Sequence, residues 1–246
     1  GLPRPRDLGP IIVAWALSLG ILIFERDLGT SLLFFGLFVA MLYISTQRRS
    51  WIILGAGLFA IGSVFSYLAF NHVRVRVQVW IDPFAFADTG GYQIVQSLYG
   101  FANGGLLGTG LGNGYPQLVP FANTDFVLAS LGEELGLAGF IAIILLYAIM
   151  VQRGLRISVA VRDPFGQLLA AGLSITLALQ VFVIVGGVTR LIPLTGLTTP
   201  FLSYGGSSLI ANWILIALLL VISHRARQPL PEVEPIPDNA TQVVSR

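Results

Sequence analysis

Asp125 is the residue of this sequence best placed to do chemistry, because it stands where a long polar stretch, residues 71–124, meets an apolar segment. If that segment crosses a membrane, a carboxylate at its outer end, below a loop that contains arginines, can act as a general base on an amphiphilic substrate. Asn123, Thr124 and Asp125 are also residue types that cap helix N-termini. The residues alone leave the catalytic and the capping interpretations of Asp125 equally open.

The polar stretch opens with residues 72–80, in which Val alternates with His, Arg, Arg and Gln before Trp80. The alternation favours a strand with Arg74 and Arg76 on one face, whereas a helix would place the two arginines roughly 200° apart. Arginine is suited to bidentate phosphate binding, so a substrate contact is one interpretation. Contact with lipid headgroups is the other, and the residues alone do not choose between them.

Two further parts of the polar stretch bear on a site. Apolar side chains at helical spacing predict a short amphipathic helix over residues 92–102, which anchors the loop at the membrane interface. Residues 103–114 contain six glycines, but no strand precedes them and no Gly-Lys-Ser/Thr follows, which excludes a phosphate-binding or dinucleotide-binding loop. Close backbone approach to a bulky ligand and plain loop mobility remain as interpretations of the glycines.

Glu133 and Glu134 lie deeper in the apolar segment that follows Asp125. Adjacent acids inside a membrane span need partners or protons, and helix packing is favoured over a proton relay. On a continuous helix, Glu133 would lie about 12 Å along the axis from Asp125 and roughly 80° around it. That separation excludes the paired carboxylates of a retaining glycosidase.

The elements that must position these residues are membrane helices. The chain has 246 residues, of which 55% are hydrophobic and 11% charged, and its mean hydropathy is +0.81. Such a composition indicates an all-α integral membrane protein, a polytopic bundle whose spans need about 20 apolar residues each. We expect six transmembrane helices within residues 1–224, a large extracytoplasmic loop at 71–124 and a disordered cytoplasmic tail at 225–246. The expected spans are residues 8–24, 31–45, 51–70, 125–150, 165–185 and 207–223.

The residue inventory excludes several kinds of chemistry. Cysteine is absent and all 14 basic residues are Arg, so thiolate nucleophiles, Schiff-base lysines and phosphate-loop lysines are excluded. The expected topology places His72 and His224 on opposite membrane faces, which excludes a two-histidine metal site and a Ser-His-Asp triad. The arginines form no basic face, so we expect no nucleic-acid partner.

The arginines also predict the orientation of the chain. Alternate connections collect ten arginines on one side and four on the other, which places both termini of this chain in the cytoplasm. The loop at 71–124, the turn at Glu25 and the turn at Arg190 then face outward together. The absence of Met at position 1 and of a signal pattern suggests a piece of a longer protein.

Seven motifs occur along the chain in a fixed order: Asp27-Leu28-Gly29-Thr30-Ser31, Arg76 with Trp80-Ile81-Asp82-Pro83, Gly91-Tyr92-Gln93 with Gln96-Ser97, Gly104-Gly105-Leu106 with Gly110-Leu111-Gly112, Thr124-Asp125-Phe126, Gly132-Glu133-Glu134-Leu135-Gly136, and Pro200-Phe201-Leu202-Ser203-Tyr204-Gly205-Gly206-Ser207-Ser208. Together they resemble the SEDS family, the shape, elongation, division and sporulation proteins. The resemblance implies a fold of about ten transmembrane helices, of which this chain is similar to the C-terminal six.

The resemblance also implies an activity. SEDS proteins are peptidoglycan glycosyltransferases that polymerise lipid II, with a class B penicillin-binding protein as partner, in the bacterial cytoplasmic membrane. By this resemblance Asp125 is the catalytic base. Two positions depart from the family pattern: Asn123 stands where His is frequent, and Arg26 stands where Pro is frequent.

The expected mechanism is a single displacement with inversion, in which undecaprenyl pyrophosphate leaves the growing glycan. We expect Arg74, Arg76 or Arg190, with Mg or Mn bound by carboxylates and phosphates, to neutralise that leaving group. The remaining substrate contacts are expected from motif residues: Gln93, Gln96, Ser97, Thr124, Ser203 and Tyr204. The alternatives are a flippase for a lipid-linked precursor and a non-catalytic membrane scaffold of the division or elongation machinery.

Overall fold

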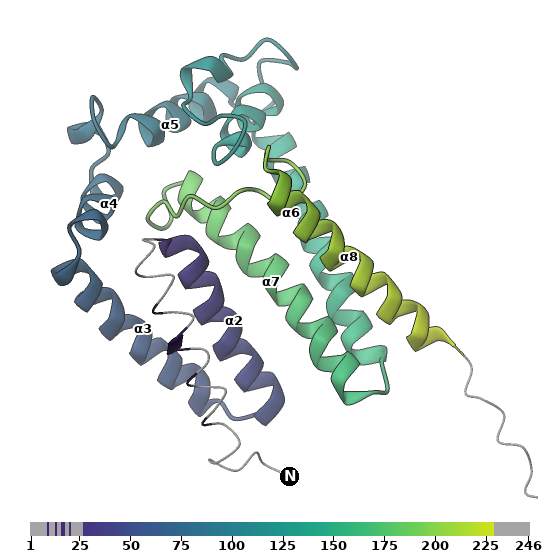
Figure 1. Ribbon diagram of the computed structural model, residues 1–246. Coiled ribbons are helices and arrows are strands. Elements are labelled where there is room, and N and C mark those ends of the chain that lie inside the picture. Colours follow the sequence, from purple (N-terminus) through teal and green to yellow (C-terminus); the bar gives the residue numbers. More distant parts are fainter. Residues whose placement is uncertain (1–8, 10–12, 14–15, 18–19, 21–26, 229–246) are drawn as a thin grey trace, which may run out of the picture.

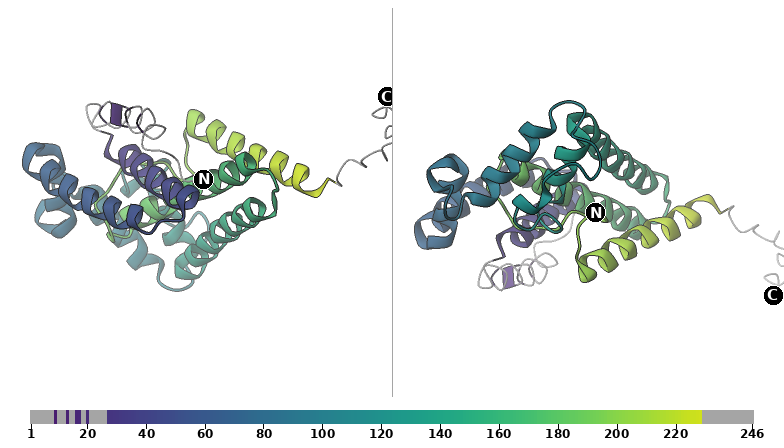
Figure 2. Two further views of the ribbon diagram at one scale, coloured as in Figure 1. Left: turned by 90° about the horizontal axis from the view of Figure 1, so that it is seen from below. Right: turned by 90° about the horizontal axis from the view of Figure 1, so that it is seen from above.

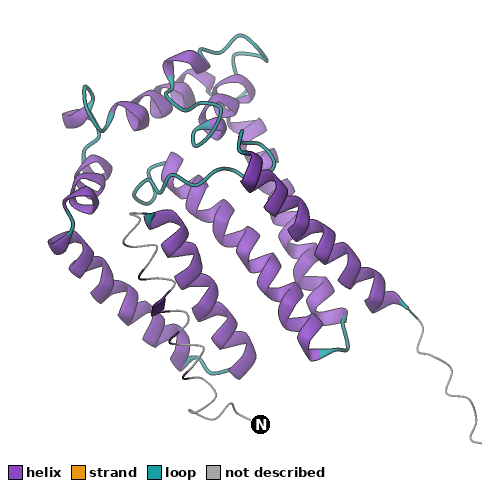
Figure 3. Cartoon of the chain, viewed as in Figure 1, coloured by secondary structure: helices purple, strands orange, loops and turns teal. Residues whose placement is uncertain are grey.

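The computed structural model describes residues 9, 13, 16, 17, 20 and 27–228, and every regular element in these residues is a helix (Figure 1, Figure 3). The all-α prediction is therefore confirmed. The elements are α2 (Leu28–Thr46), α3 (Ser50–Ala69), α4 (Asn71–Ile81), η1 (Phe84–Phe86), α5 (Tyr92–Gly104), η2 (Pro116–Leu118), α6 (Val127–Ala160), α7 (Pro164–Val188) and α8 (Gly206–Arg227).

Five of the described helices, α2, α3, α6, α7 and α8, are long and apolar enough to cross a membrane. They correspond to the second to sixth predicted spans, while most of the first predicted span, residues 8–24, lies outside the described residues. Two boundaries were wrong. Helix α6 runs to Ala160, so Arg153 and Arg156 lie on the helix rather than in a linker. Helix α8 runs to Arg227, and the rest of the predicted tail lies outside the described residues.

Helix α7 is the centre of the bundle, since it packs against α2, α6 and α8 (Figure 1). Viewed along the bundle, α4 and α8 lie on opposite sides of α7 (Figure 2). Small residues bring the central helices close together: a Cβ added at Gly154 of α6 would lie 2.2 Å from the hydroxyl oxygen of Ser174 on α7. Close backbone approach of this kind is how helices associate in a membrane, where lipid is as apolar as the side chains.

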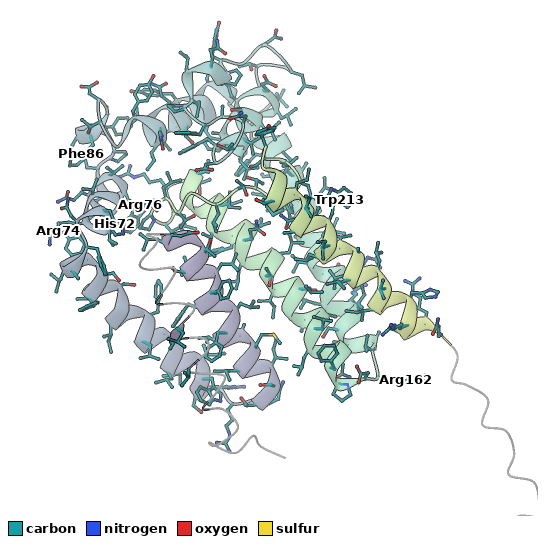
Figure 4. The ribbon with its side chains drawn as sticks, in the orientation of Figure 1. His72, Arg74, Arg76, Phe86, Arg162 and Trp213 are labelled. Atoms are coloured by element: carbon teal, nitrogen blue, oxygen red, sulfur yellow. The ribbon has the colours of Figure 1, made fainter. Side chains whose placement is uncertain are left out.

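The described arginines separate to the two ends of the bundle. Arg74, Arg76 and Arg190 lie at one end, together with α4, α5 and the α7–α8 loop, residues 189–205. The other end carries the short turns between spans and the last turns of α6 and α8, with Arg162 between α6 and α7 (Figure 4). The same turns and helix ends carry Arg48, Arg49, Arg153, Arg156, Arg225 and Arg227. The polar connections thus converge on one end, here called the loop end.

Residues 71–81 form helix α4, so the strand favoured by their alternation was wrong. Phe70 has an extended backbone (φ −117°, ψ 117°) and separates α4 from α3. A strand needs a neighbouring strand to pair its backbone groups, and the described residues offer none, whereas a helix satisfies its own. The two arginines consequently point apart, Arg74 toward α3 and Arg76 toward the α7–α8 loop (Figure 4).

The amphipathic helix predicted over 92–102 is confirmed as α5, but it lies against protein. Ile94, Val95, Ser97 and Gly100 are buried, and the helix packs along the first turns of α6. The predicted loop at 71–124 is therefore mostly ordered helix laid across the loop end of the bundle (Figure 1). It forms a fixed platform beside Asp125.

Helix α6 is interrupted at Gly136, whose backbone is left-handed (φ 68°, ψ −172°). The glycine-rich segment fills the break with backbone hydrogen bonds. The N–H groups of Thr109 and Gly110 donate to the carbonyls of Glu133 and Glu134, both at 3.0 Å. The N–H groups of Leu137 and Ala138 donate in turn to Gly105 at 2.9 Å and to Leu106 at 3.1 Å. These four bonds supply partners for two carbonyl groups before the break and two N–H groups after it. Backbone groups near a membrane need such partners because lipid offers none.

The glycines are needed because two backbones meet here. A Cβ added at Gly108 would lie 2.1 Å from the carbonyl oxygen of Glu134, and one at Gly104 would lie 2.3 Å from that of Gly132. The structure therefore uses these glycines for close approach of the segment to helix α6, which was neither of the two interpretations left open by the sequence.

Beyond the break, Leu137–Ala160 provides about 36 Å of helix, enough to cross a bilayer alone. Glu133 and Glu134 precede this span and belong to the loop end. Glu133 is 3% exposed and accepts a hydrogen bond of 2.8 Å from the Asn103 side chain. Its surroundings are those of a packing residue, which agrees with the interpretation favoured from the sequence.

Candidate active site at Asp125

Asp125 lies in a tight turn just before α6 rather than on the helix. Phe126 is the N-cap residue of α6, and no side chain makes a capping hydrogen bond there, so the capping interpretation of Asp125 was wrong. The turn is closed by the N–H groups of Thr124 and Phe126, which both donate to the carbonyl of Phe121. Because Asp125 precedes the helix, helical spacing does not describe its relation to Glu133.

The turn is anchored by Phe126, which is fully buried at 0% exposure in the main apolar cluster of the loop end. Asp125 is the next residue toward the surface and is half-buried. The buried Phe126 ring fixes the backbone of Asp125, and the Asp125 carboxylate makes no capping hydrogen bond to α6.

The α7–α8 loop holds the same turn from the other side. The Ser203 hydroxyl donates to the carbonyl of Thr124, and the backbone N–H of Tyr204 donates to that of Asn123 at 2.7 Å. The Ser203 hydroxyl oxygen also accepts from the backbone N–H of Thr199 at 2.7 Å. Ser203 is 8% exposed, so these bonds are shielded from water. Together they tie the backbone on either side of Ser203 to the two residues that precede Asp125.

Arg76 reaches the middle of the same loop from α4. Its guanidinium donates to the carbonyls of Leu194 and Thr195 at 3.3 and 3.4 Å. Gly196 follows directly, and a Cβ there would lie 3.7 Å from a carboxylate oxygen of Asp125. Arg76 and Asp125 therefore face each other across residues 194–196 of the loop.

The electrostatics of the site follow from this placement. Burial raises the pKa of Asp125 above its ordinary value of 3.8, while the positive charge of Arg76 and a hydrogen bond from the Thr124 side chain partly oppose the rise. A carboxylate with a raised pKa is a stronger base. The site thus pairs a basic carboxylate with a nearby cation.

Arg190 and Trp80 lock α4 to the start of the α7–α8 loop. The Arg190 guanidinium donates to the carbonyls of Trp80 at 2.8 Å and of Ile81, and the Trp80 indole N–H donates back to the carbonyl of Arg190 at 3.0 Å. Arg190 adopts a left-handed backbone (φ 61°), which is uncommon for a residue with a Cβ. The guanidinium thereby satisfies carbonyl groups at the C-terminus of α4.

The structure does not bring all the predicted site residues together. Arg76, Thr124, Asp125 and Ser203 converge, and the Tyr204 backbone joins them while its side chain stays 79% exposed. Arg74 turns away to α3, where it donates to the carbonyl of Leu68 at 3.1 Å and lies 5.8 Å from the Tyr67 ring centroid.

The three polar residues predicted on α5 differ in accessibility. Ser97 is 0% exposed and its hydroxyl donates to the carbonyl of Val188 at 3.3 Å, so it offers no accessible polar atom. Gln93 and Gln96 are half-buried on the same helix. Sequence reasoning missed the carbonyls of residues 194 and 195 and the close approach of Gly196, because backbone groups leave no pattern of side-chain types.

The comparisons with known proteins agree with the motifs. Residues 2–228 match the model of the FtsW, RodA and SpoVE family, which is described as a cell cycle protein family. This chain belongs to that family. The SEDS resemblance is thereby confirmed.

Curated relatives from two mycobacteria carry the RodA name. Peptidoglycan glycosyltransferase RodA of Mycobacterium tuberculosis is 59% identical over 249 residues, which cover 100% of this chain and 53% of that protein. The RodA of Mycobacterium leprae is 57% identical, over 100% of this chain and 54% of that protein. A probable peptidoglycan glycosyltransferase FtsW of Geobacter metallireducens is 39% identical over 89% of this chain and 59% of its own length. The chain thus spans about half the length of the mycobacterial relatives.

Solved structures show the same fold. A chain from a peptidoglycan synthase complex, in which polymerization and crosslinking are structurally coordinated, superposes with a TM-score of 0.73 at 27% identity, over 92% of this chain and 64% of that chain. The Rod shape determining protein RodA of Thermus thermophilus superposes with a TM-score of 0.60 at 24% identity, over 93% of this chain and 60% of that chain. The second likeness supports the SEDS fold alone.

Proposed function

We propose that the protein containing this chain is a peptidoglycan glycosyltransferase that polymerises lipid II on the outer face of the bacterial cytoplasmic membrane. The observation that carries the proposal is the half-buried Asp125 carboxylate, with a raised pKa, held opposite Arg76 at the loop end. The names of the mycobacterial RodA and Geobacter FtsW relatives support it. A base next to a cation suits a reaction that removes a hydroxyl proton and releases a pyrophosphate.

The chemical step is a single displacement. Asp125 takes the proton of the acceptor sugar hydroxyl of lipid II, and the hydroxyl oxygen forms a bond to the anomeric carbon of the growing strand. The bond from that carbon to the pyrophosphate oxygen breaks, and undecaprenyl pyrophosphate leaves with the electron pair. A single displacement inverts the anomeric carbon, and it needs one carboxylate, as the packing environment of Glu133 also suggests.

The three arginines of the loop end have two proposed roles, neutralising the charge of the leaving group and holding neighbouring helices in place. Arg76 is held by two carbonyls that leave part of its guanidinium available, so it is the residue we assign to the leaving pyrophosphate. Arg190 is largely committed to the C-terminus of α4, and Arg74 to α3. Gln93 and Gln96 remain our proposed sugar contacts on the α5 platform, with Thr124 and Tyr204 beside the base.

Mg or Mn remains part of the proposal. Within the described residues no group of three His, Cys, Asp or Glu side chains could hold a metal ion. Asp125 is a single carboxylate opposite a cation, so the protein groups by themselves do not make a cation site. Such a cation would arrive with the pyrophosphate, whose oxygens are suitable ligands, and no step above depends on it.

We also propose that the loop end faces the cell exterior and that both termini of this chain are cytoplasmic. The concentration of arginines at the opposite end of the bundle supports this orientation. A class B penicillin-binding protein is the proposed partner, which the likeness to a chain of a peptidoglycan synthase complex supports.

The deciding experiment is polymerisation of lipid II by the full-length protein with its penicillin-binding partner, with and without Mg or Mn. Wild-type protein should yield glycan strands and the Asp125→Asn variant should yield none above background. Normal strand yield from Asp125→Asn would remove Asp125 from the mechanism. Transport of lipid II without polymerisation would instead favour the flippase, and the absence of both activities from the wild-type protein would favour the scaffold.

A further inference from the structure

Helix α4 carries Arg76 at the loop end (Figure 4), and the helix before it does not set its direction. Phe70 separates α4 from α3 with an extended backbone (φ −117°, ψ 117°), so α4 does not continue the axis of α3. Val79 of α4 is 4% exposed and packs into the main apolar cluster of the loop end. Apolar packing is non-directional, so it holds α4 against the bundle without fixing its rotation about its own axis. That rotation is left to hydrogen bonds, which are directional.

Two side chains of α4 make such bonds to the α7–α8 loop. Arg76 and Trp80 are four positions apart, which places them on one face of the helix, one turn from each other. Arg76 donates to the carbonyls of Leu194 and Thr195. The Trp80 indole N–H donates to the carbonyl of Arg190 at 3.0 Å. The helix is therefore tied to the loop at two levels, and a rotation that breaks the Trp80 bond also moves Arg76.

Arg190 completes the level at Trp80 from the side of the loop. Its guanidinium donates to the carbonyl of Trp80 at 2.8 Å and to that of Ile81. Carbonyl groups at the C-terminus of a helix lack partners within the helix, so these two are suited to accept. The three hydrogen bonds that join Trp80 and Ile81 to Arg190 are here called the clamp. Because bonds run in both directions between α4 and the loop, neither can turn without losing one.

Arg190 occupies a backbone position that suits glycine better than arginine. It follows Thr189, the C-cap residue of α7, and its backbone is left-handed (φ 61°). Glycine is the usual residue at this point after a helix, because it has no Cβ to strain the conformation. The bonds of the Arg190 guanidinium to α4 offset that strain. Strained positions of this kind persist where the surroundings fix them, and they cluster at functional sites.

We propose that the clamp is a positioning device: by fixing the rotation of α4, it holds the Arg76 guanidinium opposite the Asp125 carboxylate. The side chains of the clamp act through Arg76 and need no contact with a substrate. Only the effect on catalysis rests on the proposed function, because the arrangement of Arg76 and Asp125 belongs to the folded protein itself. Among the residues that the structure describes, Arg76 is the charged group that lowers the pKa of Asp125. That pKa therefore reports where Arg76 lies, whether or not the protein is active.

The first test is the titration of Asp125 in the full-length protein, followed by NMR of carboxyl-labelled aspartate and assigned by the signal that Asp125→Asn removes. Arg190→Gly deletes the guanidinium and keeps a residue suited to the left-handed backbone. It should raise the pKa of Asp125 by at least about half as much as Arg76→Gln does, because a displaced cation stabilises the carboxylate less. Trp80→Phe deletes the indole N–H without changing any charge, and it should raise the pKa by a smaller amount. Arg74→Gln is the control, since it removes a charge from the same helix outside the clamp, and it should leave the pKa in place.

A double variant separates positioning from a direct effect of the Arg190 charge. If the clamp acts through Arg76, adding Arg190→Gly to Arg76→Gln should raise the pKa of Asp125 no further, because the group that the clamp positions is gone. An equal rise in the presence and absence of Arg76 would show that Arg190 acts by its own charge, and it would overturn the inference. An unchanged pKa in Arg190→Gly and Trp80→Phe, with thermal unfolding midpoints like that of the wild type, would also overturn it.

Catalysis gives the second readout, in polymerisation of lipid II by the full-length protein with its partner. Arg190→Gly should lower kcat by about five- to tenfold and leave KM within about twofold, as expected for loss of an interaction made in the transition state. The same substitution in the Arg76→Gln background should have little further effect. A rise in KM with an unchanged kcat would place Arg190 in contact with the substrate and overturn the inference. If the wild-type protein polymerises nothing, the proposed function fails, and the titration alone decides the role of the clamp.

Discussion

Asp125 and Glu133 are two carboxylates at the same end of the molecule, and their surroundings differ. Glu133 is the more buried, at 3% exposed, and it is enclosed by α5, the glycine-rich segment and the amide of Asn103. Asp125 is only half-buried, but its pKa is raised and it faces Arg76 across a loop. Burial alone therefore does not mark the acid that we propose as the base. Partial access together with a facing positive charge does, because a base must reach a substrate proton.

The largest expected effect separates these two acids. Asp125→Asn should lower lipid II polymerisation by about 10³-fold or more, because about 4 kcal/mol of transition-state stabilisation depends on proton removal. Glu133→Gln keeps the shape and a hydrogen-bonding side chain, so activity should fall less than about tenfold. Rates of strand formation and thermal unfolding midpoints measured on both full-length variants make the comparison. A loss of activity in folded Glu133→Gln equal to that in Asp125→Asn would break it.

The second prediction concerns the framework around Glu133. Gly108 has a left-handed backbone (φ +83°), and Gly108→Ala would place a Cβ 2.1 Å from the Glu134 carbonyl oxygen. The glycine-rich segment should therefore separate from the break in α6, and the free energy of unfolding should fall by about 3 kcal/mol or more. Gly112→Ala is the control, since its φ is +76° but no atom lies within 4 Å, and only about 1 kcal/mol of backbone strain is expected. Thermal unfolding in detergent measures both. Equal destabilisation would show that conformation, and not close approach, explains the glycines.

The third prediction concerns the positioning of Asp125. Ser203→Ala removes the hydroxyl that bridges the backbones of Thr199 and Thr124, and loss of about 1–2 kcal/mol of positioning should lower kcat by about 5- to 30-fold with little change in KM. Ser207→Ala, at an exposed position on the first turn of α8, should change kcat less than twofold. Steady-state kinetics with lipid II distinguish the two. A rise in KM without a change in kcat would assign Ser203 to substrate binding instead.

The smallest expected effect is on pH dependence. Asp125 works as a base only when ionised, so kcat/KM should fall as the pH drops through its raised pKa. Arg76 lowers that pKa, so Arg76→Gln should move the acid limb to higher pH, by up to about one unit for a half-exposed pair. Arg74→Gln should leave the limb in place, because Arg74 points to α3. A shift of the limb to lower pH in Arg76→Gln would contradict the facing arrangement of Arg76 and Asp125.

Hydrophobic length and periodicity predicted the spans and α5 from the sequence, because these patterns report local burial. They failed at α4, because the alternation of Val favours a strand locally, but the part of the chain that the structure describes offers no second strand to pair with it. The roles of the glycines and of Arg190 were also beyond the sequence. Arg190 bonds residues 109 and 110 positions away, and the glycines fit against a backbone that has no side-chain signature.

For Asp125 itself, the sequence supplied the residue and the resemblance supplied the role. That Asp125 precedes the helix without capping it could not be predicted, because the start of α6 depends on a turn whose hydrogen bonds end on the carbonyl of Phe121. The pairing with Arg76 could not be predicted either, because it depends on contacts between residues 118 and 119 positions apart in the chain.

The break in α6 at Gly136, which the glycine-rich segment fills with hydrogen bonds, has a consequence for biosynthesis. Its bonds join residues close in sequence, such as Thr109 and Glu133, which are 24 positions apart. The bonds around Asp125 join Ser203 to Thr124 across 79 positions, and Arg76 to Leu194 across 118. As the chain leaves the ribosome, the platform of α5 and α6 can therefore close before α7 and α8 exist, while the turn that holds the carboxylate gains its partners only when the α7–α8 loop has been made. A nascent chain stalled before that loop would carry a finished scaffold and an unformed site.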